Sequence, residues 1–532
     1  MKPLNIDELS IPQKIGQLLI ARTPTMLDSD DAEFALTLIR DHALGGVQVA
    51  PNADAHKIIS RIQQAADYPI FIAADMETGF PLSELQIACP LSLGVVNDPQ
   101  CVYDFAKITA IQAKQFGYNM IWSPIVDTAT RDSLLDVLRS FGENKERVAE
   151  LSISFMKAFS DCGIIGAAKH YPSIRDDGSD SHMIEKVSYH TREELLSENL
   201  YPYRQMIQQL GNNMTGVMTS HARMLNIDPT FPATLSKPCI DILRNDLGFD
   251  GLVITDSLAM MGIIQKYGDA NAPALAVAAG NDLVLPNYRV TLRDTYHAML
   301  SAFEHGLFSE DRLNEACARV IRGQGRTLVQ PAQKEISAHD REVIARINRE
   351  CVCAVTSQDL PVRIDRNKRH LFVVLKRNIY DSNDLDVNFE IEFDKSWDPQ
   401  HLANLLLDKF PHSDVEFICE FPHRDQNERV CAAAAAHDDV VFVTFCDANA
   451  YQGSNGLTER VRYLIASMSY NIAAIVHVGN PYALEQIVHV PRYIFALPHK
   501  SCIETIPAIL SGEAPVKGSL PLNLKLQDAS NR

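Results

Sequence analysis

The sequence lacks the features that mark membrane-spanning, secreted or nucleic-acid-binding proteins. No run of about 18 apolar residues occurs, so we expect no membrane span. Residues 1–8 contain no apolar signal core, from which we expect a cytoplasmic protein. Lys and Arg number 49 against 67 Asp and Glu, a net charge of −18. Because binding to a phosphate backbone needs clustered positive charge, we expect no nucleic-acid partner.

Motifs for metals and cofactors are also missing. The eleven cysteines include no Cys-x-x-Cys pair, which disfavours zinc ribbons and thioredoxin-like sites. Their odd number and apolar surroundings indicate reduced thiols in a reducing compartment. None of the seventeen histidines forms a His-x-x-x-His pair with a carboxylate partner, and the residues around Gly178 do not form a phosphate-binding loop. We therefore expect neither a metal ion nor another cofactor.

What the sequence does contain is an alternation of short apolar runs and helical patterns through residue 329. Segments such as 54–67 and 99–116 have the helical pattern. This alternation predicts an α/β fold with a parallel sheet, either closed as a barrel or open and doubly wound. The candidate strands are residues 45–50, 70–75, 120–123, 163–168, 216–219, 252–255 and 282–285.

Polar side chains stand at or just after the ends of these candidate strands. Asp256 directly follows the β-branched run 252–255, which a turn signal at 248–251 introduces. In a barrel of parallel strands, the carboxyl ends of the strands carry the chemistry. The clustering therefore favours a TIM-like (β/α)8 barrel with one active face. The other residues of this group are Asp75, Asp127, Lys169, His170 and His221.

A second, shorter set of apolar runs follows a break in the pattern. Residues 307–328 have the pattern of a closing helix, and 330–335 interrupt it with Pro331. We predict a barrel over residues 1–329, a linker over 330–345 and a smaller α/β sandwich over 346–532. The candidate strands of the sandwich are residues 370–375, 439–444, 472–478 and 493–497.

Several segments resemble, in chain order, the motifs of glycoside hydrolase family 3, and specifically its β-N-acetylglucosaminidase branch. Residues 234–256 resemble the stretch that ends in the family's nucleophilic aspartate. Lys169-His170-Tyr171-Pro172 resembles its Lys-His-Phe-Pro, and Asp180-Ser181-His182 has the spacing of the dyad that distinguishes the branch using histidine as acid/base. Asp75-Met76-Glu77-Thr78-Gly79 resembles Asp-Gln-Glu-Gly-Gly. Further matches lie at 123–127, 139–142, 279–282, 512–515 and 518–521.

The resemblance implies a retaining glycosidase that removes terminal β-linked N-acetylglucosamine from cell-wall fragments or chitooligosaccharides. Asp256 would be the nucleophile that forms a glycosyl–enzyme ester; capping of a following helix is its structural alternative. His182 would be the acid/base, because an ordinary histidine pKa of about 6.5 suits proton transfer in both directions. Asp180 would accept the other ring N–H and fix the tautomer. The family's barrel can lack or reverse a strand.

Five further residues are candidates for binding the carbohydrate. Lys169, His170 and Arg139 would donate to sugar hydroxyls, and Asp75 would accept from them. Asp127 would bind sugar or brace the pocket. A structural histidine at 170 and a surface arginine at 139 are the corresponding alternatives.

Departures from the family pattern leave other functions open. Ser173-Ile174-Arg175 stands where the family usually has Gly-His-Gly, and Ser83 stands where it has an arginine. One alternative is a phosphorylase, since a neutral histidine repels phosphate less than a carboxylate does. Another is a sugar-binding protein without catalysis. A β-glucosidase would instead take a glutamate acid from the second domain, where Glu459 is the candidate. The sequence leaves the oligomeric state open.

Overall fold

The chain folds into two compact units. The computed structural model describes residues 1–22, 29–131, 136–173, 183–268, 271–355, 362–376, 397–446 and 456–527. The first unit comprises residues 1–86, 98–133 and 139–343, and the second comprises 87–97, 134–138 and 344–532. Helix α15 (Ala338–Glu350) begins inside the predicted linker. The boundaries at 329 and 346 stay a prediction.

A seven-stranded parallel sheet forms the centre of the first unit, in the order β1-β2-β3-β4-β5-β7-β9. Nearly all residues of these strands are buried, as expected of strands covered on both faces. The α/β fold with a TIM-like barrel is therefore confirmed. Its strands are β1 (Ile20–Arg22), β2 (Gly46–Gln48), β3 (Phe71–Ala74), β4 (Met120–Ile121), β5 (Ile165–Tyr171), β7 (Gly216–Thr219) and β9 (Leu252–Thr255).

The ring closes through the predicted strand 282–285, which forms single-residue bridges. Leu283 bridges Ile254 of β9, and Val284 bridges Leu19 beside β1, both in parallel orientation. Backbone hydrogen bonds of 3.0 Å, from Thr255 N to Leu283 O and from Ile20 N to Val284 O, hold this eighth position. The first and last strands of the sheet are thereby joined, and all strand ends of one polarity meet at one face.

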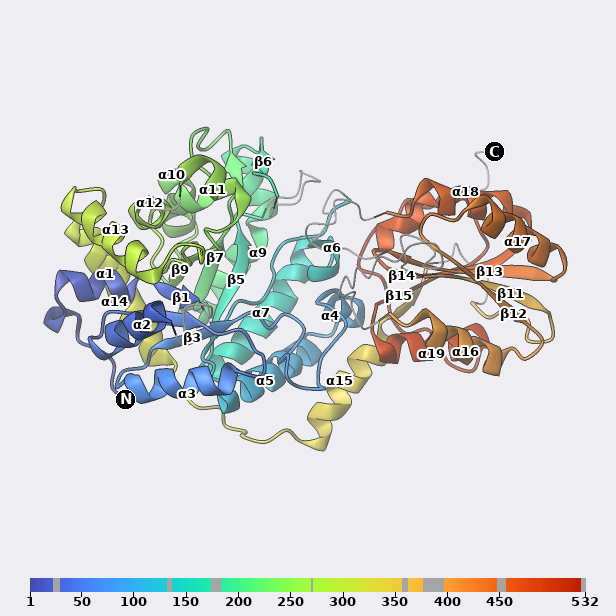
Figure 1. Cartoon of the computed structure of the whole chain (residues 1–532), viewed down its shortest axis with the longest axis horizontal. Helices are drawn as coiled ribbons and strands as arrows, with labels where there is room; N and C mark the ends of the chain where they lie inside the picture. The colour runs from blue at the N-terminus through green and yellow to red at the C-terminus, as the bar shows by residue number, and fades with distance from the viewer. Residues whose placement is uncertain are drawn as a thin grey trace. The chain divides into compact units, whose positions relative to one another are not determined.

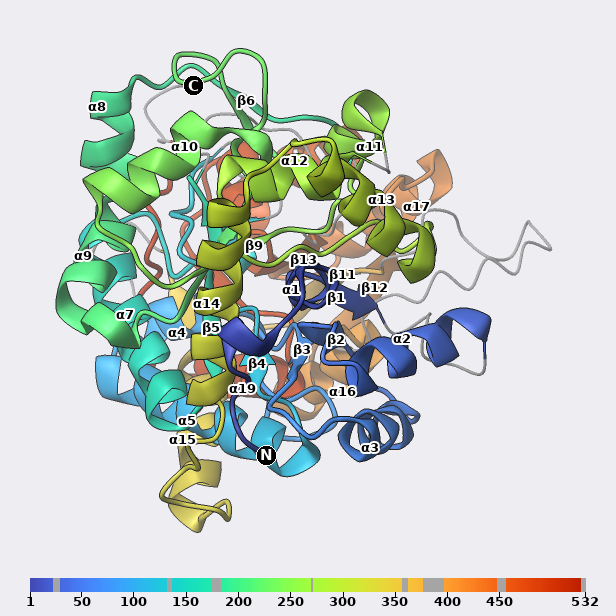
Figure 2. The ribbon, with the colours of Figure 1, turned by 90° about the vertical axis from the view of Figure 1, so that its left-hand side faces the viewer.

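Helices surround the barrel strands (Figure 2). Helix α5 shows why they form where they do: Asp98 accepts from the N–H groups of Gln100 and Cys101, and Gly117 ends the helix at φ 108°. The helices are α1 (Ile11–Gln17), α2 (Asp30–Arg40), α3 (Ala55–Ala65), α5 (Pro99–Phe116), α7 (Lys145–Asp161), α8 (Arg192–Glu194), α9 (Tyr201–Leu210), α10 (Lys237–Asp241), α11 (Met261–Tyr267), α12 (Ala272–Ala279), α13 (Leu292–Glu304) and α14 (Glu310–Arg326). The short helix α6 (Asp136–Arg139) has its first three residues in the second unit and its last in the first. A two-stranded parallel sheet joins β6 (Val187–Ser188) and β8 (Arg223–Met224). Across the described ranges, no helix has the length and apolar character needed to cross a membrane.

The second unit is an α/β sandwich, as predicted. Its six-stranded sheet has the order β10-β15-β14-β13-β11-β12, and only β10 runs antiparallel to its neighbour. Helices α16 and α19 lie on one face of the sheet, and α17 and α18 lie on the other (Figure 1). The strands are β10 (Val352–Ala354), β11 (His370–Leu375), β12 (Asp414–Ile418), β13 (Asp439–Cys446), β14 (Ile472–Gly479) and β15 (Tyr493–Ala496). The helices are α4 (Leu91–Val96), α16 (Pro399–Lys409), α17 (Arg424–Ala435), α18 (Glu459–Ser467) and α19 (Lys500–Leu510).

Candidate functional site

The polar residues singled out in the sequence lie at the carboxyl-terminal ends of the barrel strands. Asp75 follows β3, Lys169 and His170 belong to the end of β5, and Asp256 follows β9. Asp127 follows β4 in the chain. Because the strands are parallel and the ring is closed, these ends gather at one face.

A bulge in β5 lets two consecutive residues contribute to this face. Side chains normally alternate along a strand, so Lys169 and His170 would point to opposite sides. The pairing of β5 with β7 shifts register between Ala168 and Tyr171. Lys169 turns instead to the chain after β4, accepting from Val126 N at 2.7 Å and donating its own N–H to Pro124 O at 3.0 Å. This local irregularity re-aims both side chains.

The buried Lys169 joins two carboxylates in a charge cluster. Its Nζ donates to Asp75 Oδ1 at 2.7 Å and lies 2.8 Å from Glu77 Oε1. Arg139 binds the same Glu77 through two hydrogen bonds, from Nε to Oε2 at 2.9 Å and from Nη2 to Oε1 at 2.6 Å. Two cations and two anions thus satisfy one another in a fixed geometry.

The charges in this cluster persist despite burial. Burial opposes the ionised form of Glu77, but Arg139 and Lys169 lower its pKa well below the ordinary value. For Lys169, burial likewise disfavours the charge, and Asp75 and Glu77 outweigh it, so its pKa is raised. The cluster therefore presents a stable cation beside the Asp75 carboxylate across the neutral pH range.

Glu77 was not among the predicted site residues, and its carboxylate binds donor groups of Arg139 that we expected to meet the sugar. We predicted that Arg139 donates in bidentate fashion to sugar hydroxyls, and the structure directs two of its donor groups to Glu77. The sequence could have indicated Glu77, because in the segment Asp75 to Gly79 it stands where the family motif Asp-Gln-Glu-Gly-Gly has its glutamate. Lys169 and Asp75 are brought together as the strand-end argument predicted.

Asp127 orients His170 through two contacts to one carboxylate oxygen. Oδ2 of Asp127 accepts from the backbone N of His170 at 3.0 Å and lies 2.8 Å from the ring Nδ1. A carboxylate only accepts, so Nδ1 carries the proton in this contact. The ring orientation and tautomer of His170 are thereby set.

Asp256 is held at the end of β9 in an ionised state. Its backbone N–H donates to Thr219 O at 3.0 Å, and its Oδ1 accepts from Ser257 N at 2.6 Å. Burial alone would raise the pKa of this carboxyl group. The neighbouring His170 and His221, together with the Ser257 N–H, bring the pKa below its ordinary value. Such a carboxylate is available as a nucleophile at neutral pH.

Arg22, which the sequence argument missed, adds a guanidinium at the end of β1. Its Nε donates to Gln48 Oε1 at 2.6 Å, and its Nη1 lies 3.3 Å from Ser257 Oγ. The guanidinium carbon lies 4.5 Å from the centre of the Tyr288 ring. Burial lowers the pKa of Arg22, and the nearby Tyr288, Asp75 and Asp256 act in the opposite direction. No motif marked it, and the strand that carries it was not among the predicted strands.

The structure describes two of the positions that depart from the family pattern, Ser83 and Ser173. Ser83 braces its own loop, since its Oγ accepts from Gln112 Nε2 at 2.7 Å and from Leu85 N at 3.0 Å. Ser173 is buried and adopts a positive φ of 62°. The predicted dyad, Asp180 and His182, and residues 174–175 of the divergent segment lie outside the described residues.

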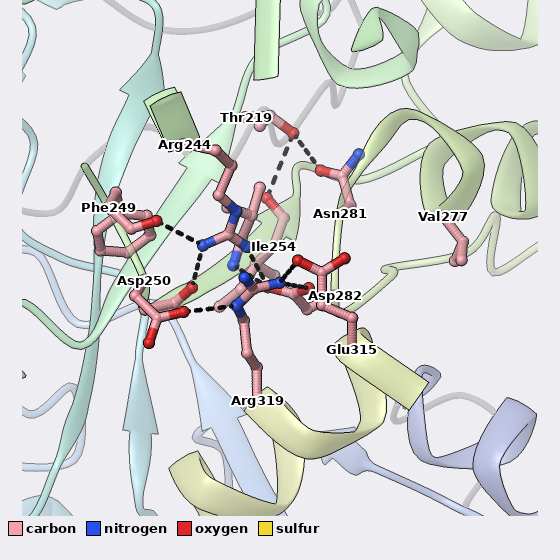
Figure 3. Close-up of polar contacts among 12 residues, drawn as sticks. Thr219, Arg244, Phe249, Asp250, Ile254, Val277, Asn281, Asp282, Glu315 and Arg319 are labelled. Carbon is pink, nitrogen blue, oxygen red and sulfur yellow. Dashed lines mark hydrogen bonds and ion pairs between the residues drawn. The ribbon is translucent and has the colours of Figure 1, made fainter. Parts of the chain in front are cut away.

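A buried carboxylate at the start of β9 supports the strand that carries Asp256. Asp282 is fully buried, and its Oδ2 accepts from Val253 N at 3.0 Å and from Arg244 at 2.5 Å. Arg312 binds Oδ1 at 2.7 Å, and Arg319 approaches the same oxygen at 3.4 Å (Figure 3). The Ala-Gly-Asn-Asp match at 279–282 is thus a structural motif here. Within the described residues, no group of His, Cys, Asp and Glu is arranged to hold a metal ion.

Comparison with known proteins identifies the family. Residues 10–323 match the glycosyl hydrolase family 3 N-terminal domain. The chain is 25% identical to the beta-N-acetylglucosaminidase/beta-glucosidase of Cellulomonas fimi, over 97% of this chain and 94% of that protein. It is 26% identical to beta-hexosaminidase LpqI of Mycobacterium bovis, over 53% of this chain and 75% of that protein.

The fold comparison agrees with the sequence comparison. The solved structure of a family 3 beta-N-acetylglucosaminidase from Paenibacillus sp. str. FPU-7 superposes with a TM-score of 0.79 at 25% identity, covering 98% of this chain and all of that one. The domain match extends over more than half of the sequence. The chain therefore belongs to glycosyl hydrolase family 3 and is a glycosidase.

Proposed function

We propose that this glycosidase removes terminal β-linked N-acetylglucosamine from cell-wall fragments or chitooligosaccharides, with retention of configuration. Asp256 attacks the anomeric carbon while His182 protonates the departing glycosidic oxygen, which yields a glycosyl ester on Asp256. His182, whose tautomer we propose Asp180 to fix, then removes a proton from water as the water oxygen attacks the anomeric carbon. The ester bond breaks, and free sugar and the Asp256 carboxylate are regenerated.

The observation that carries the proposal is the position and state of Asp256. It stands at the active end of a barrel strand, one carboxylate oxygen is fixed by Ser257 N–H, and its pKa is lowered. A nucleophile must be ionised and held in a fixed direction, and Asp256 meets both requirements. The relatives named beta-N-acetylglucosaminidase and beta-hexosaminidase support the choice of sugar.

Other residues at the same face of the barrel supply complementary groups for the sugar. Asp75 offers carboxylate acceptors, with a side chain that is 55% exposed, and Lys169 beside it is 3% exposed. His170 has its Nδ1 committed to Asp127, so its Nε2 is the ring atom left to meet a hydroxyl. We propose that these three side chains recognise hydroxyl groups of the terminal sugar, while Glu77 and Arg139 keep Lys169 in place.

A kinetic screen tests this function. Purified protein is assayed with aryl β-N-acetylglucosaminide, β-glucoside and β-xyloside, each with and without phosphate. We expect selective release from the N-acetylglucosaminide and no gain from phosphate. A phosphate-dependent rate with sugar 1-phosphate as product would indicate a phosphorylase instead. Sugar binding without turnover in all arms would indicate a non-catalytic binding protein.

We also propose a reducing compartment for the protein. All eleven cysteines are free thiols, and ten of them are buried. Free buried thiols are typical of cytosolic proteins, where disulfides are rare. Localisation by fractionation of the source cells checks this, and enrichment in an oxidising compartment would contradict it.

A further inference from the structure

His221, a buried histidine after β7, contacts the segment that carries Asp256 and is not used by the mechanism above. Its side chain belongs to a residue that is 4% exposed. The ring Nε2 lies 2.8 Å from Ser257 O, the carbonyl oxygen of the residue after the nucleophile. A carbonyl oxygen only accepts hydrogen bonds, so Nε2 carries a proton.

The proton on the other ring nitrogen depends on the hydroxyl of Thr234. The ring Nδ1 lies 3.1 Å from Thr234 Oγ1. That hydroxyl oxygen has three further oxygen neighbours: Ser220 O at 2.8 Å, Thr219 Oγ1 at 3.0 Å and Thr219 O at 3.3 Å. A single hydroxyl proton is shared among these contacts, and two of the three oxygens are carbonyl acceptors.

Asn281 determines which oxygen donates in the contact between Thr234 Oγ1 and Thr219 Oγ1. Its Nδ2 donates to Thr234 O at 2.7 Å and to Ala276 O at 2.8 Å, which fixes the amide orientation because a flipped oxygen would face two carbonyls. Asn281 Oδ1 therefore accepts from Thr219 Oγ1 at 3.0 Å (Figure 3). With its own proton committed, Thr219 Oγ1 faces Thr234 as an acceptor.

The hydroxyl proton of Thr234 is thus drawn to Thr219 or Ser220, away from the histidine ring. If it pointed at Nδ1 instead, Thr234 Oγ1 would face Ser220 O at 2.8 Å and Thr219 Oγ1 at 3.0 Å with no proton in either contact. Ser220 O also accepts the backbone N–H of Thr234 at 3.0 Å, so the cost of this arrangement is the repulsion between oxygens that approach closely with no proton between them. Thr234 Oγ1 therefore accepts from His221, and Nδ1 carries a proton as well.

We infer that His221 is an imidazolium ion and a positioning residue for the nucleophile, an inference that rests on the proposed role of Asp256. Its Nε2–H holds Ser257 O, while Ser257 N–H holds the Asp256 carboxylate at 2.6 Å. A buried cation needs a counter-charge, and Asp256 supplies it. Among the described residues, the other charged or titratable groups that act on Asp256 are His170 and Lys169 of β5 and Arg22 of β1.

The fixed positive charge serves both chemical steps. It favours the carboxylate form of Asp256 before attack, and it stabilises the same carboxylate as the leaving group when water displaces it from the sugar. The effect of His221 reaches the carboxylate of Asp256 by way of Ser257, which contacts both residues.

Nitrogen NMR of the full-length protein labelled with 15N-histidine tests the protonation state directly. We expect both ring nitrogens of His221 to resonate as protonated nitrogens at pH 7, with assignment by the loss of the signal in His221→Gln. One unprotonated ring nitrogen at pH 7 would overturn the inference. This measurement needs no substrate, so it decides the point even if the proposed function fails.

Kinetics test the effect on the nucleophile. The His221→Gln variant loses the charge and keeps an N–H donor for Ser257 O. We expect the acid limb of its kcat/KM profile to move up by about one pH unit, the usual size of a neighbouring-charge effect. Thr234→Val should shift the limb in the same direction, and Thr234→Ser should retain the wild-type profile.

His305→Gln, at the exposed end of α13, is the matched control. An unmoved acid limb in His221→Gln at unchanged Tm would refute the role.

Discussion

The Glu77→Gln substitution tests whether the charge cluster holds the candidate site together. The change keeps the shape of the side chain and removes its charge. Glu77 receives two hydrogen bonds from Arg139, and Lys169 lies 2.8 Å away. Breaking a buried ion pair from one side costs about 3–5 kcal/mol. Lys169 keeps Asp75 as a partner and the Arg139 side chain is 28% exposed, so we expect a loss of about 2–3 kcal/mol.

The two tryptophans make the measurement specific to the barrel. Trp122 is 2% exposed and lies in the first unit, whereas Trp397 lies in the second. In a Trp397→Phe background, urea unfolding followed by tryptophan fluorescence reports on the first unit alone. Glu84→Gln is the control, because Glu84 forms an exposed ion pair with Arg341 and should cost less than about 0.5 kcal/mol. Equal stability of Glu77→Gln and the wild type would refute the reasoning.

The same variant should change the response to acid. The folded-state pKa of Glu77 is lowered, so its contribution is fully present above its unfolded-state pKa of about 4.3. That contribution is lost as pH falls from there toward the folded-state pKa. The wild-type barrel should therefore lose more stability than Glu77→Gln between neutral pH and the acid range. Parallel losses in the two proteins would contradict the assigned charge state.

Three further substitutions probe other contacts of the barrel face. Asp127→Asn should lower kcat/KM about 10- to 100-fold, because the charge-assisted bond to His170 is worth about 1.5–3 kcal/mol, and steady-state kinetics checks this. Asp282→Asn should destabilise the first unit by about 3–5 kcal/mol in the fluorescence assay, since three arginines face that buried carboxylate. Arg22→Lys should lower kcat/KM about tenfold, because lysine cannot reproduce the planar stacking on Tyr288, whereas Arg289→Lys, farther from the ring and exposed, should not.

Most of the fold could be predicted from hydrophobic runs, and the misses have physical causes. The predicted strands 216–219 and 252–255 match β7 and β9, since a buried parallel strand is a continuous apolar run. Strand β1 (Ile20–Arg22) was missed because it follows helix α1 (Ile11–Gln17) almost directly, and a short apolar run there cannot be distinguished from the end of a buried helix by periodicity alone. Strand β12 (Asp414–Ile418) was missed because, as an edge strand, it is only partly buried and carries charged residues.

The site could be located from sequence more easily than its contacts could be derived. Strand-end placement brought Asp75, Lys169 and Asp256 to one face, because parallel strands share polarity. The position of a residue at a strand end does not predict which side chain it forms an ion pair with. The contact of Glu77 with Arg139 joins residues 62 apart in the chain, and the bulge that re-aims Lys169 depends on pairing with two different neighbours. The predicted roles of Asp180 and His182 stay predictions.

Trapping of the covalent intermediate tests the central claim most directly. The protein is incubated with a slowly hydrolysed fluorinated N-acetylglucosaminide, and intact-mass and peptide mass spectrometry locate the adduct. The proposed mechanism predicts one glycosyl group on Asp256 and no adduct in Asp256→Ala. The control variant Asp250→Asn should retain the adduct, because the Asp250 carboxylate pairs with Arg319 and has no proposed part in the reaction. An adduct on another residue, or steady turnover by Asp256→Ala, would contradict the assignment of Asp256 as the nucleophile.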